Sequence, residues 1–485
     1  METHSKEDKE RCIQLPDHDP APARCDGAGV SRRDFVPGVG AALAAFTVLP
    51  RHVLGGAGYV APSDKLNIAG VGVGAMGAAY LKSCESENIV ALADVDFEFA
   101  AKTFARYPKA KTYRDFRIML EKEKGIDAVI IGTPDHTHAV VAMAAIKLGK
   151  HVYCAKPMTR TVYECRQVTR AAREAKVATQ MSTQSCASEN ACATEELIQS
   201  GAIGPVREVH LWTDRPLWPQ GLVRPPETPP VPSNLEWDLW IGPAPSRPYN
   251  PLYHPLAWRG WYDFGTGALG DMALHKFHAV FRALKLTHPT SVHSTTIVVR
   301  ELAPPGQGDP GWSRSRTVKF PESFPHCEIV TWDFPARGDL PPVRLHWYDG
   351  GLKPPRPADL EPGQSLRPEG TYYVGDKGVL LTPGGGAGQA NVLLPAAKFK
   401  DFTPPPKTIP RSIGHYQEWV VAAKGGPPAN ANFDFSRLTA ETALIGVISA
   451  RTGKHLFWDP QNMRFTNDDD ANQYINPPYR SGWSL

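Results

Sequence analysis

The chain of 485 residues exceeds what one ordinary hydrophobic core requires, so on the order of two or three domains are expected. Its 53 Lys and Arg residues against 50 Asp and Glu residues give a net charge of +3, and no long basic run follows the first sixty residues. This balance argues against a nucleic-acid partner. No apolar stretch reaches the roughly 18–20 residues of a membrane span.

Residues 1–60 are interpreted as a leader rather than as part of the fold. Residues 1–30 are polar, and the run Ser31-Arg32-Arg33-Asp34-Phe35 precedes an apolar stretch from 36 to 49. Paired arginines before a short hydrophobic region resemble a twin-arginine export signal, which predicts a periplasmic or otherwise exported protein. The alternative is a chance arginine pair before a buried helix.

A glycine-rich turn opens residues 61–185, which are expected to form a nucleotide-binding domain. The apolar run 66–71 is followed by Gly72, Gly74 and Gly77 with the spacing G-x-G-x-x-G. Such a strand, turn and helix suit a dinucleotide, because the glycines permit the turn and let the backbone approach a pyrophosphate at the helix N-terminus. The alternative is a βαβ unit whose turn is glycine-rich for steric reasons alone.

The next apolar run, 89–93, predicts a second strand that ends at Asp94. This carboxylate follows the glycines at about the 20-residue spacing at which an acidic side chain accepts the ribose hydroxyls of adenosine. Asp96 stands nearby, and no arginine adjoins it in the sequence. These features favour NAD over NADP.

Strands and helices alternate from residue 64 to about 185, which predicts a parallel sheet. Ligands gather at the carboxyl ends of such strands. Lys156 follows the expected strand 151–154 and precedes Pro157, so its amine is expected to point toward the ligand. The alternative is a solvated surface lysine. The residues expected at these strand ends are Gly72, Asp94, Thr133, Pro134, Lys156 and Thr183.

Asp271 and His275 stand four residues apart in a helix that is expected to begin near Asp271 and to run through Phe281. This spacing places both side chains on one helix face. There the carboxylate would orient the imidazole and raise its basicity, as a general base requires. The alternative is a capping Asp271 with a structural His275.

Four motifs together resemble the Gfo/Idh/MocA oxidoreductase family. They are the glycine fingerprint, the run G-T-P-D-H-T-H at 132–138, C-A-K-P at 154–157 and G-D-x-x-x-H at 270–275. The resemblance implies an α/β fold with an N-terminal Rossmann domain and, over residues 186–485, an α/β domain with a large, mostly antiparallel open sheet. That second domain would bind the substrate.

The resemblance also implies a nicotinamide cofactor and a sugar or polyol substrate. In family terms Lys156 would bind the substrate hydroxyl, Asp271 would help to bind the substrate, and His275 would be the acid/base. The cofactor-binding residues expected are Gly72, Gly74, Ala75, Met76, Asp94, Thr133, Pro134, His136, His138 and Lys156. A homo-oligomer is also expected, because an open sheet commonly serves as a dimer face.

The chain departs from the family pattern at three positions. Most relatives carry Glu where this chain has Ala155, many carry Asn where it has Thr183, and many carry Asp where it has His278. Losing a carboxylate beside Lys156 removes a group that would orient the lysine or tune its pKa. Three functions therefore stay open: a sugar or polyol dehydrogenase, a redox-neutral NAD-dependent glycosidase, and a non-catalytic sugar-binding relative.

The stretch from 215 to 262 is rich in proline and tryptophan. Its aromatic rings would suit the C–H faces of a sugar, although packing of a long loop explains each ring equally well. These rings belong to Trp218, Trp237, Trp240, Trp258, Trp261 and Tyr262. The six cysteines beyond the leader show no metal-ligand spacing, so buried free thiols and no metal site are expected.

Overall fold

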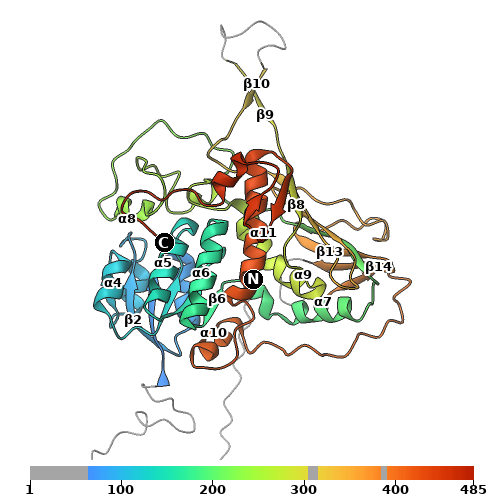
Figure 1. The fold of residues 1–485 in the computed structure, drawn as a ribbon, viewed down its shortest axis with the longest axis horizontal. Helices are drawn as coiled ribbons and strands as arrows, with labels where there is room; N and C mark the ends of the chain where they lie inside the picture. The colour runs from blue at the N-terminus through green and yellow to red at the C-terminus, as the bar shows by residue number, and fades with distance from the viewer. Residues whose placement is uncertain (1–63, 304–314, 384–389) are drawn as a thin grey trace, which may run out of the picture.

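The computed structural model describes residues 64–303, 315–383 and 390–485 (Figure 1). The expected leader, residues 1–60, lies outside these ranges. Within them no helix combines the length and the hydropathy needed to cross a membrane.

The first domain is built on a six-stranded sheet in which every neighbouring pair is parallel. The strand order is β3-β2-β1-β4-β5-β6, so the order reverses beside β1, where a ligand crevice is expected. The strands are β1 (Asn67–Val71), β2 (Asn88–Ala93), β3 (Lys111–Tyr113), β4 (Ala128–Ile131), β5 (His151–Cys154) and β6 (Thr179–Met181). The helices are α2 (Ala75–Ser83), α3 (Ala101–Arg106), α4 (Phe116–Lys122), α5 (Asp135–Lys147) and α6 (Val162–Ala175).

The second domain contains a nine-stranded sheet in the order β15-β14-β13-β7-β12-β11-β8-β16-β17. It is mostly antiparallel, as expected, with a parallel pair between β7 and β12 at its centre. The strands are β7 (Val206–Trp212), β8 (Ser291–Thr296), β11 (Glu328–Phe334), β12 (Val343–Tyr348), β13 (Gly370–Gly375), β14 (Gly378–Pro383), β15 (Val392–Leu394), β16 (Leu456–Asp459) and β17 (Arg464–Phe465). A separate hairpin of β9 (Val299–Leu302) and β10 (Ser315–Val318) projects from the body of the molecule (Figure 1).

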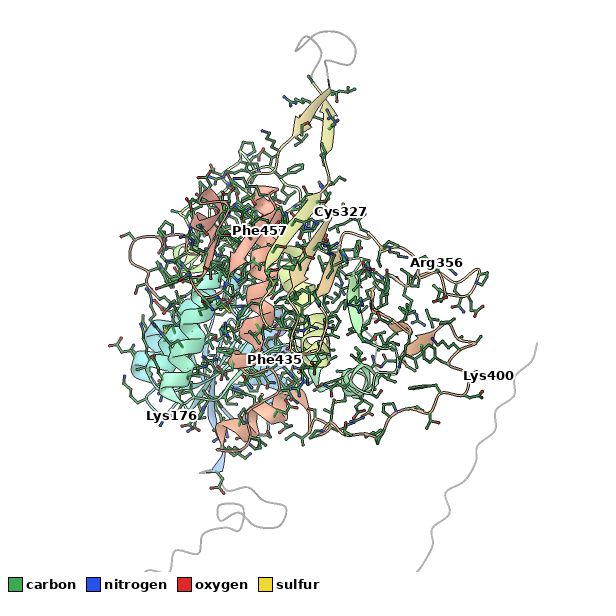
Figure 2. All side chains as sticks on the ribbon, turned by 45° about the vertical axis from the view of Figure 1, so that its right-hand side comes forward. Lys176, Cys327, Arg356, Lys400, Phe435 and Phe457 are labelled. Carbon is green, nitrogen blue, oxygen red and sulfur yellow. The ribbon has the colours of Figure 1, made fainter. Side chains whose placement is uncertain are left out.

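Two helices fill the layer between the sheets. The long helix α11 (Phe433–Thr452) packs against α6 of the first domain and against β8 and β11 of the second, and α9 (Leu274–Leu284) lies beside it. Phe435 of α11 contacts the ring of His278 on α9, with centroids 4.7 Å apart (Figure 2). The remaining helices are α7 (Glu189–Gln199), α8 (Trp237–Ile241) and α10 (His415–Ala423), with short 3-10 turns at 184–187, 257–260 and 470–474.

One face of the large sheet is apolar and packs on these helices. Val330 and Trp332 of β11, with Leu345 and Trp347 of β12, belong to the same hydrophobic core as α9 and α11. Because side chains alternate along a strand, the intervening residues point to the opposite face, here called the outer face. This face carries polar and aromatic side chains.

Residues 213–262, here called the tryptophan segment, fold back onto the first domain. The carboxylate of Asp96 receives hydrogen bonds from the side chains of Asn234, at 2.6 Å, and His254, at 2.8 Å. The rings of Trp237 and Trp240 stack with centroids 4.7 Å apart, and Trp261 is fully buried among them. Trp237 and Trp261 therefore pack within the segment, in line with the alternative to sugar stacking.

Candidate functional site

A cavity of about 380 Å³ lies at the carboxyl ends of β1, β2 and β4. Its floor comes from the first domain and its roof from the tryptophan segment. The expected cofactor residues that line it are Gly72, Gly74, Ala75, Met76, Asp94, Thr133 and Pro134. The roof residues are Leu239, Trp240, His254, Pro255, Leu256, Trp258 and Arg259.

The glycine turn has the geometry that its spacing predicts. Gly72 has φ +72°, and a β-carbon there would lie 2.6 Å from the backbone nitrogen of Thr133. A β-carbon on Gly77 would lie 1.9 Å from the carbonyl oxygen of Gly72. Both positions therefore require glycine, one for the turn and one for the close packing of α2 on β1. The N-terminus of α2 consequently faces the cavity.

Asp94 ends β2 and forms part of the cavity wall. Its Oδ2 accepts hydrogen bonds from the backbone N–H groups of Val73, at 2.7 Å, and Gly74, at 3.3 Å, and its Oδ1 accepts one from Asp96 at 3.0 Å. Burial raises the pKa of this carboxyl, against the lowering effect of the backbone hydrogen bonds. The side chain thus holds the glycine turn, and because each carboxylate oxygen accepts more than one hydrogen bond it remains able to bind ribose hydroxyls.

Two residues that line the cavity each contain a polar atom that could bond a ligand. Thr133 Oγ1 and Trp240 Nε1 are buried and have no hydrogen-bond partner within the described residues. Leaving such groups unpaired is costly, so a ligand that bonds them recovers that cost. With the glycine turn and Asp94, these atoms fit an adenine dinucleotide.

His136 and His138 do not line this cavity, which departs from the expectation that they bind the cofactor. Both are fully buried. The ring nitrogens of His136 face the carbonyl oxygens of Trp240, at 2.8 Å, and Phe264, at 3.3 Å, while those of His138 face Pro157, at 2.7 Å, and Thr133, at 2.8 Å. Both rings instead join the start of α5 to neighbouring loops.

Lys156 does not line this cavity, and its ammonium forms an ion pair with the carboxylate of Asp271. The imidazole of His275 is close enough to feel both charges. Burial and the positive charge of Lys156 lower the pKa of His275 to about 3, while Asp271 acts in the opposite direction. The three expected catalytic side chains therefore meet in one buried region.

The expected role of Asp271 needs a correction, because its hydrogen bond goes to Lys156 and none to His275 is found among the described side chains. The reason is local. Residues Leu269–Ala273 form a π-helical turn that leads into α9, so the spacing of four does not have α-helical geometry here. This wider π-helical turn directs the side chain of Asp271 toward Lys156. Single π-helical turns of this kind are frequent at functional sites.

Asp135 and Arg259 also belong to this region, although the sequence analysis did not single them out. Asp135 is buried, accepts a hydrogen bond from Thr266 Oγ1 at 2.7 Å and has its pKa raised to about 7 by burial. The charges of Arg259, Asp271 and Lys156 act on it in that order of strength. A carboxyl group is therefore present near Lys156 even though Ala155 supplies none. The sequence feature that could have identified Asp135 is its position directly after Thr133 and Pro134 at the end of a strand.

Comparison with known protein families agrees with this geometry. Residues 66–183 match the model of an oxidoreductase family with an NAD-binding Rossmann fold, and residues 217–297 match the C-terminal alpha/beta domain of the same family. These two segments of the chain therefore match the Gfo/Idh/MocA oxidoreductase family.

Individual members of the Gfo/Idh/MocA family resemble parts of the chain. Inositol 2-dehydrogenase 1 of Saccharopolyspora erythraea is 30% identical over 102 residues, 20% of this chain and 30% of that protein. Levoglucosan dehydrogenase of Pseudarthrobacter phenanthrenivorans is 26% identical over 188 residues, 38% of this chain and 39% of that protein. The chain thus matches well under half the length of these curated relatives.

Among solved structures, the WlbA dehydrogenase of Bordetella pertussis, in complex with NADH and UDP-GlcNAcA, superposes with a TM-score of 0.55 at 16% identity. The match covers 81% of this chain and 99% of that one. At this identity the likeness bears on the fold.

Two departures from the Gfo/Idh/MocA pattern have structural explanations. Thr183 is buried, and its hydroxyl bonds the carbonyl oxygen of Met181 at 3.5 Å. His278 is buried on α9, where its Nε2 lies 3.4 Å from the carbonyl oxygen of Asn430 and its ring packs on Phe435. Both side chains contact the protein's own interior.

Proposed function

We propose that the protein transfers hydride between a hydroxyl group of a sugar or polyol and a tightly held NAD. The observation that carries this proposal is that Lys156, Asp271 and His275 lie within electrostatic reach of one another, and that Lys156 and Asp271 also act on Asp135 together with Arg259 of the cavity roof. Relatives named as dehydrogenases of inositol and levoglucosan support a hydroxyl-bearing ring as the substrate.

The charge of each side chain at the site indicates its role in the reaction. Burial and the charge of Lys156 lower the pKa of His275 to about 3, so its imidazole is neutral near pH 7. The higher basicity expected from Asp271 is not found, and His275 would accept the hydroxyl proton as a weak base. Lys156 carries a positive charge that stabilises the alkoxide as it forms, and Asp271 holds the ammonium in place. When bound, NAD supplies the hydride acceptor.

NAD rather than NADP is favoured by Asp94, whose carboxylate would oppose a 2′-phosphate in the cavity wall. Arg114 lines the same cavity, but its guanidinium pairs with Glu236 at 3.3 Å and stacks over Phe97 at 4.3 Å. It is therefore already engaged on the protein's own groups.

The tryptophan segment that covers the cavity supports a second candidate function, one in which the cofactor is not exchanged. A cofactor held under the tryptophan segment exchanges slowly, and the proposed export through the twin-arginine route would separate it from the cellular nicotinamide pool. The reaction must then return the hydride, either to a second sugar or, in a redox-neutral glycosidase, to the same ring.

We propose further that the protein acts as a homo-oligomer.

In the first step of the test, the purified protein is denatured. The nucleotide that it releases is then identified, together with the redox state of that nucleotide. NAD or NADH in near-stoichiometric amount supports the proposal, and no nucleotide contradicts it. The protein is then given a panel of sugars and polyols, followed by aryl glycosides without added NAD. Reduction of bound NAD by a sugar supports the dehydrogenase, release of the aryl group supports the glycosidase, and inertness toward both panels contradicts an enzymatic role.

A further inference from the structure

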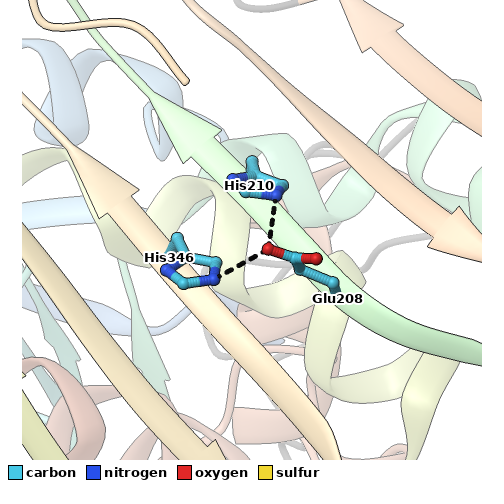
Figure 3. Close-up of side chains that lie close together, drawn as sticks. All are labelled: Glu208, His210 and His346. Carbon is cyan, nitrogen blue, oxygen red and sulfur yellow. Dashed lines mark ion pairs between the residues drawn. The ribbon is translucent and has the colours of Figure 1, made fainter. Parts of the chain in front are cut away.

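Three side chains far from the dinucleotide cavity converge on the outer face of the large sheet (Figure 3). His210 of β7 and His346 of β12 are direct partners in the parallel pair at the centre of the sheet. Their rings stack with centroids 4.7 Å apart at an interplanar angle of 15°. Glu208 stands two residues before His210 on the same strand, so it points to the same face.

The donor atoms of these side chains are arranged around a common point. The Nε2 atoms of His210 and His346 each lie 3.0 Å from the same oxygen, Oε1 of Glu208. All three donor atoms lie within 4.8 Å of one another. Nε2 of His346 is buried and forms no hydrogen bond among the described residues, so the contact with Glu208 lacks hydrogen-bond geometry.

Two of these separations are in the range that a small cation imposes on its ligands. Metal–ligand bonds of about 2.0–2.2 Å at angles of 90–110° place two ligand atoms about 2.8–3.6 Å apart. Both imidazole–carboxylate distances of 3.0 Å fall in this range, and the two Nε2 atoms lie within 4.8 Å of each other.

The other ring nitrogens are already fixed. Nδ1 of His210 lies 3.1 Å from the hydroxyl of Tyr348, and Nδ1 of His346 lies 2.9 Å from Oγ1 of Thr331. Metal-binding histidines usually donate their second N–H to such a group, which orients the ring and leaves Nε2 for the ion.

We propose that Glu208, His210 and His346 bind one divalent transition-metal ion, such as Zn²⁺. Two imidazoles and a carboxylate suit Zn²⁺ and its first-row neighbours, whereas Ca²⁺ and Mg²⁺ prefer all-oxygen ligand sets. The side chain of Glu208 is 43% exposed, so water completes the coordination from the solvent side. The site is separate from the NAD cavity, because α9 and α11 pack on the opposite face of this sheet.

The experiment uses the full chain, expressed without a polyhistidine tag and stripped with a chelator. Zn²⁺ binding is measured by calorimetry and metal analysis, and Co²⁺ binding by visible absorption. We expect the chain to bind one equivalent of Zn²⁺ tightly. Binding should also raise Tm, because the ion links β7 to β12. His346→Ala and Glu208→Gln should weaken binding at least about 100-fold, since substitutions in the outer shell alone cost 10–100-fold.

His293→Ala is the matched control. His293 lies on the same face, two strands from β12, and pairs across the sheet with Thr331. It should keep the tight equivalent. Absence of micromolar Zn²⁺ binding by the stripped chain overturns the proposal, as does unchanged binding in Glu208→Gln. That variant preserves size at a half-exposed position, so it decides the question even if the alanine variant does not fold.

Discussion

The ammonium of Lys156 pairs with the carboxylate of Asp271, a residue 115 positions later in the chain. One comes from the loop after β5 of the first domain, and the other from the π-helical turn before α9 of the second. The ion pair therefore joins the two domains at the candidate catalytic region, and it holds the lysine near His275.

Replacing Lys156 should remove turnover and leave the cofactor bound. We expect Lys156→Ala to lower kcat/KM for the sugar about 10²–10³-fold, because the alkoxide loses its stabilising charge. Nucleotide released on denaturation should be unchanged, since Lys156 does not line the NAD cavity. Lys82→Ala, an exposed lysine at the end of α2, is the control. Undiminished turnover in Lys156→Ala would refute the assignment.

The low pKa of His275 sets the pH dependence of the reaction. The imidazole takes a proton only as the pH falls toward 3, so the base form persists far below the ordinary histidine range. We expect kcat/KM to show no loss between pH 8 and pH 5 from this group. His275→Ala should lower kcat about 10²–10⁴-fold. An acidic limb of the profile centred near pH 6.5 would contradict this role.

The salt link between the tryptophan segment and the first domain should control cofactor retention. His254 pairs with Asp96 at 2.8 Å and also lines the roof of the cavity. We expect His254→Ala to speed NAD release about tenfold, corresponding to about 1.4 kcal/mol. The measurement is bound nucleotide after timed dilution and gel filtration. Leu217→Ala, 72% exposed in the same segment, should retain NAD like the unsubstituted chain. Equal retention in both variants argues against the roof as the barrier.

A buried carboxyl pair should make stability fall as the pH rises. Asp349 has its pKa raised to about 7 by burial, and burial with the charge of Asp349 raises that of Glu328. The folded state therefore holds protons that the unfolded state releases near pH 4, so stability is lost between about pH 4 and pH 7.

Removing one carboxyl group of the Glu328–Asp349 pair should reduce the loss of stability at high pH. We expect Glu328→Gln to raise Tm by about 2–4 °C at pH 8 and by less at pH 5, as measured by thermal unfolding. Glu328 Oε2 has no hydrogen-bond partner among the described residues, so the amide displaces none there. Glu361→Gln, at an exposed position, should show no such difference. An equal shift at both pH values would contradict the raised pKa values of this pair.

Local patterns predicted many elements closely. The amphipathic run at 162–175 forms α6, and Thr161 and Glu164 make a capping box at its start. The alternating runs 206–212 and 343–348 form β7 and β12. Helix α3 begins only at Ala101, because the carboxylate of Asp96 accepts hydrogen bonds from the backbone nitrogens of residues 98 and 99 in a turn ahead of it.

The sequence by itself determined the alternating strands and helices of the first domain, the glycine turn and most of the NAD-binding wall, because each depends on residues that are close along the chain. Only the tertiary structure decided that His136 and His138 bond carbonyl groups, that Asp271 turns to Lys156, and that Asp135 and Arg259 join them. It also brought Glu208 and His210 beside His346. Contacts between distant segments depend on how helices and sheets pack, and the spacing of residues along one strand or helix carries no record of that packing.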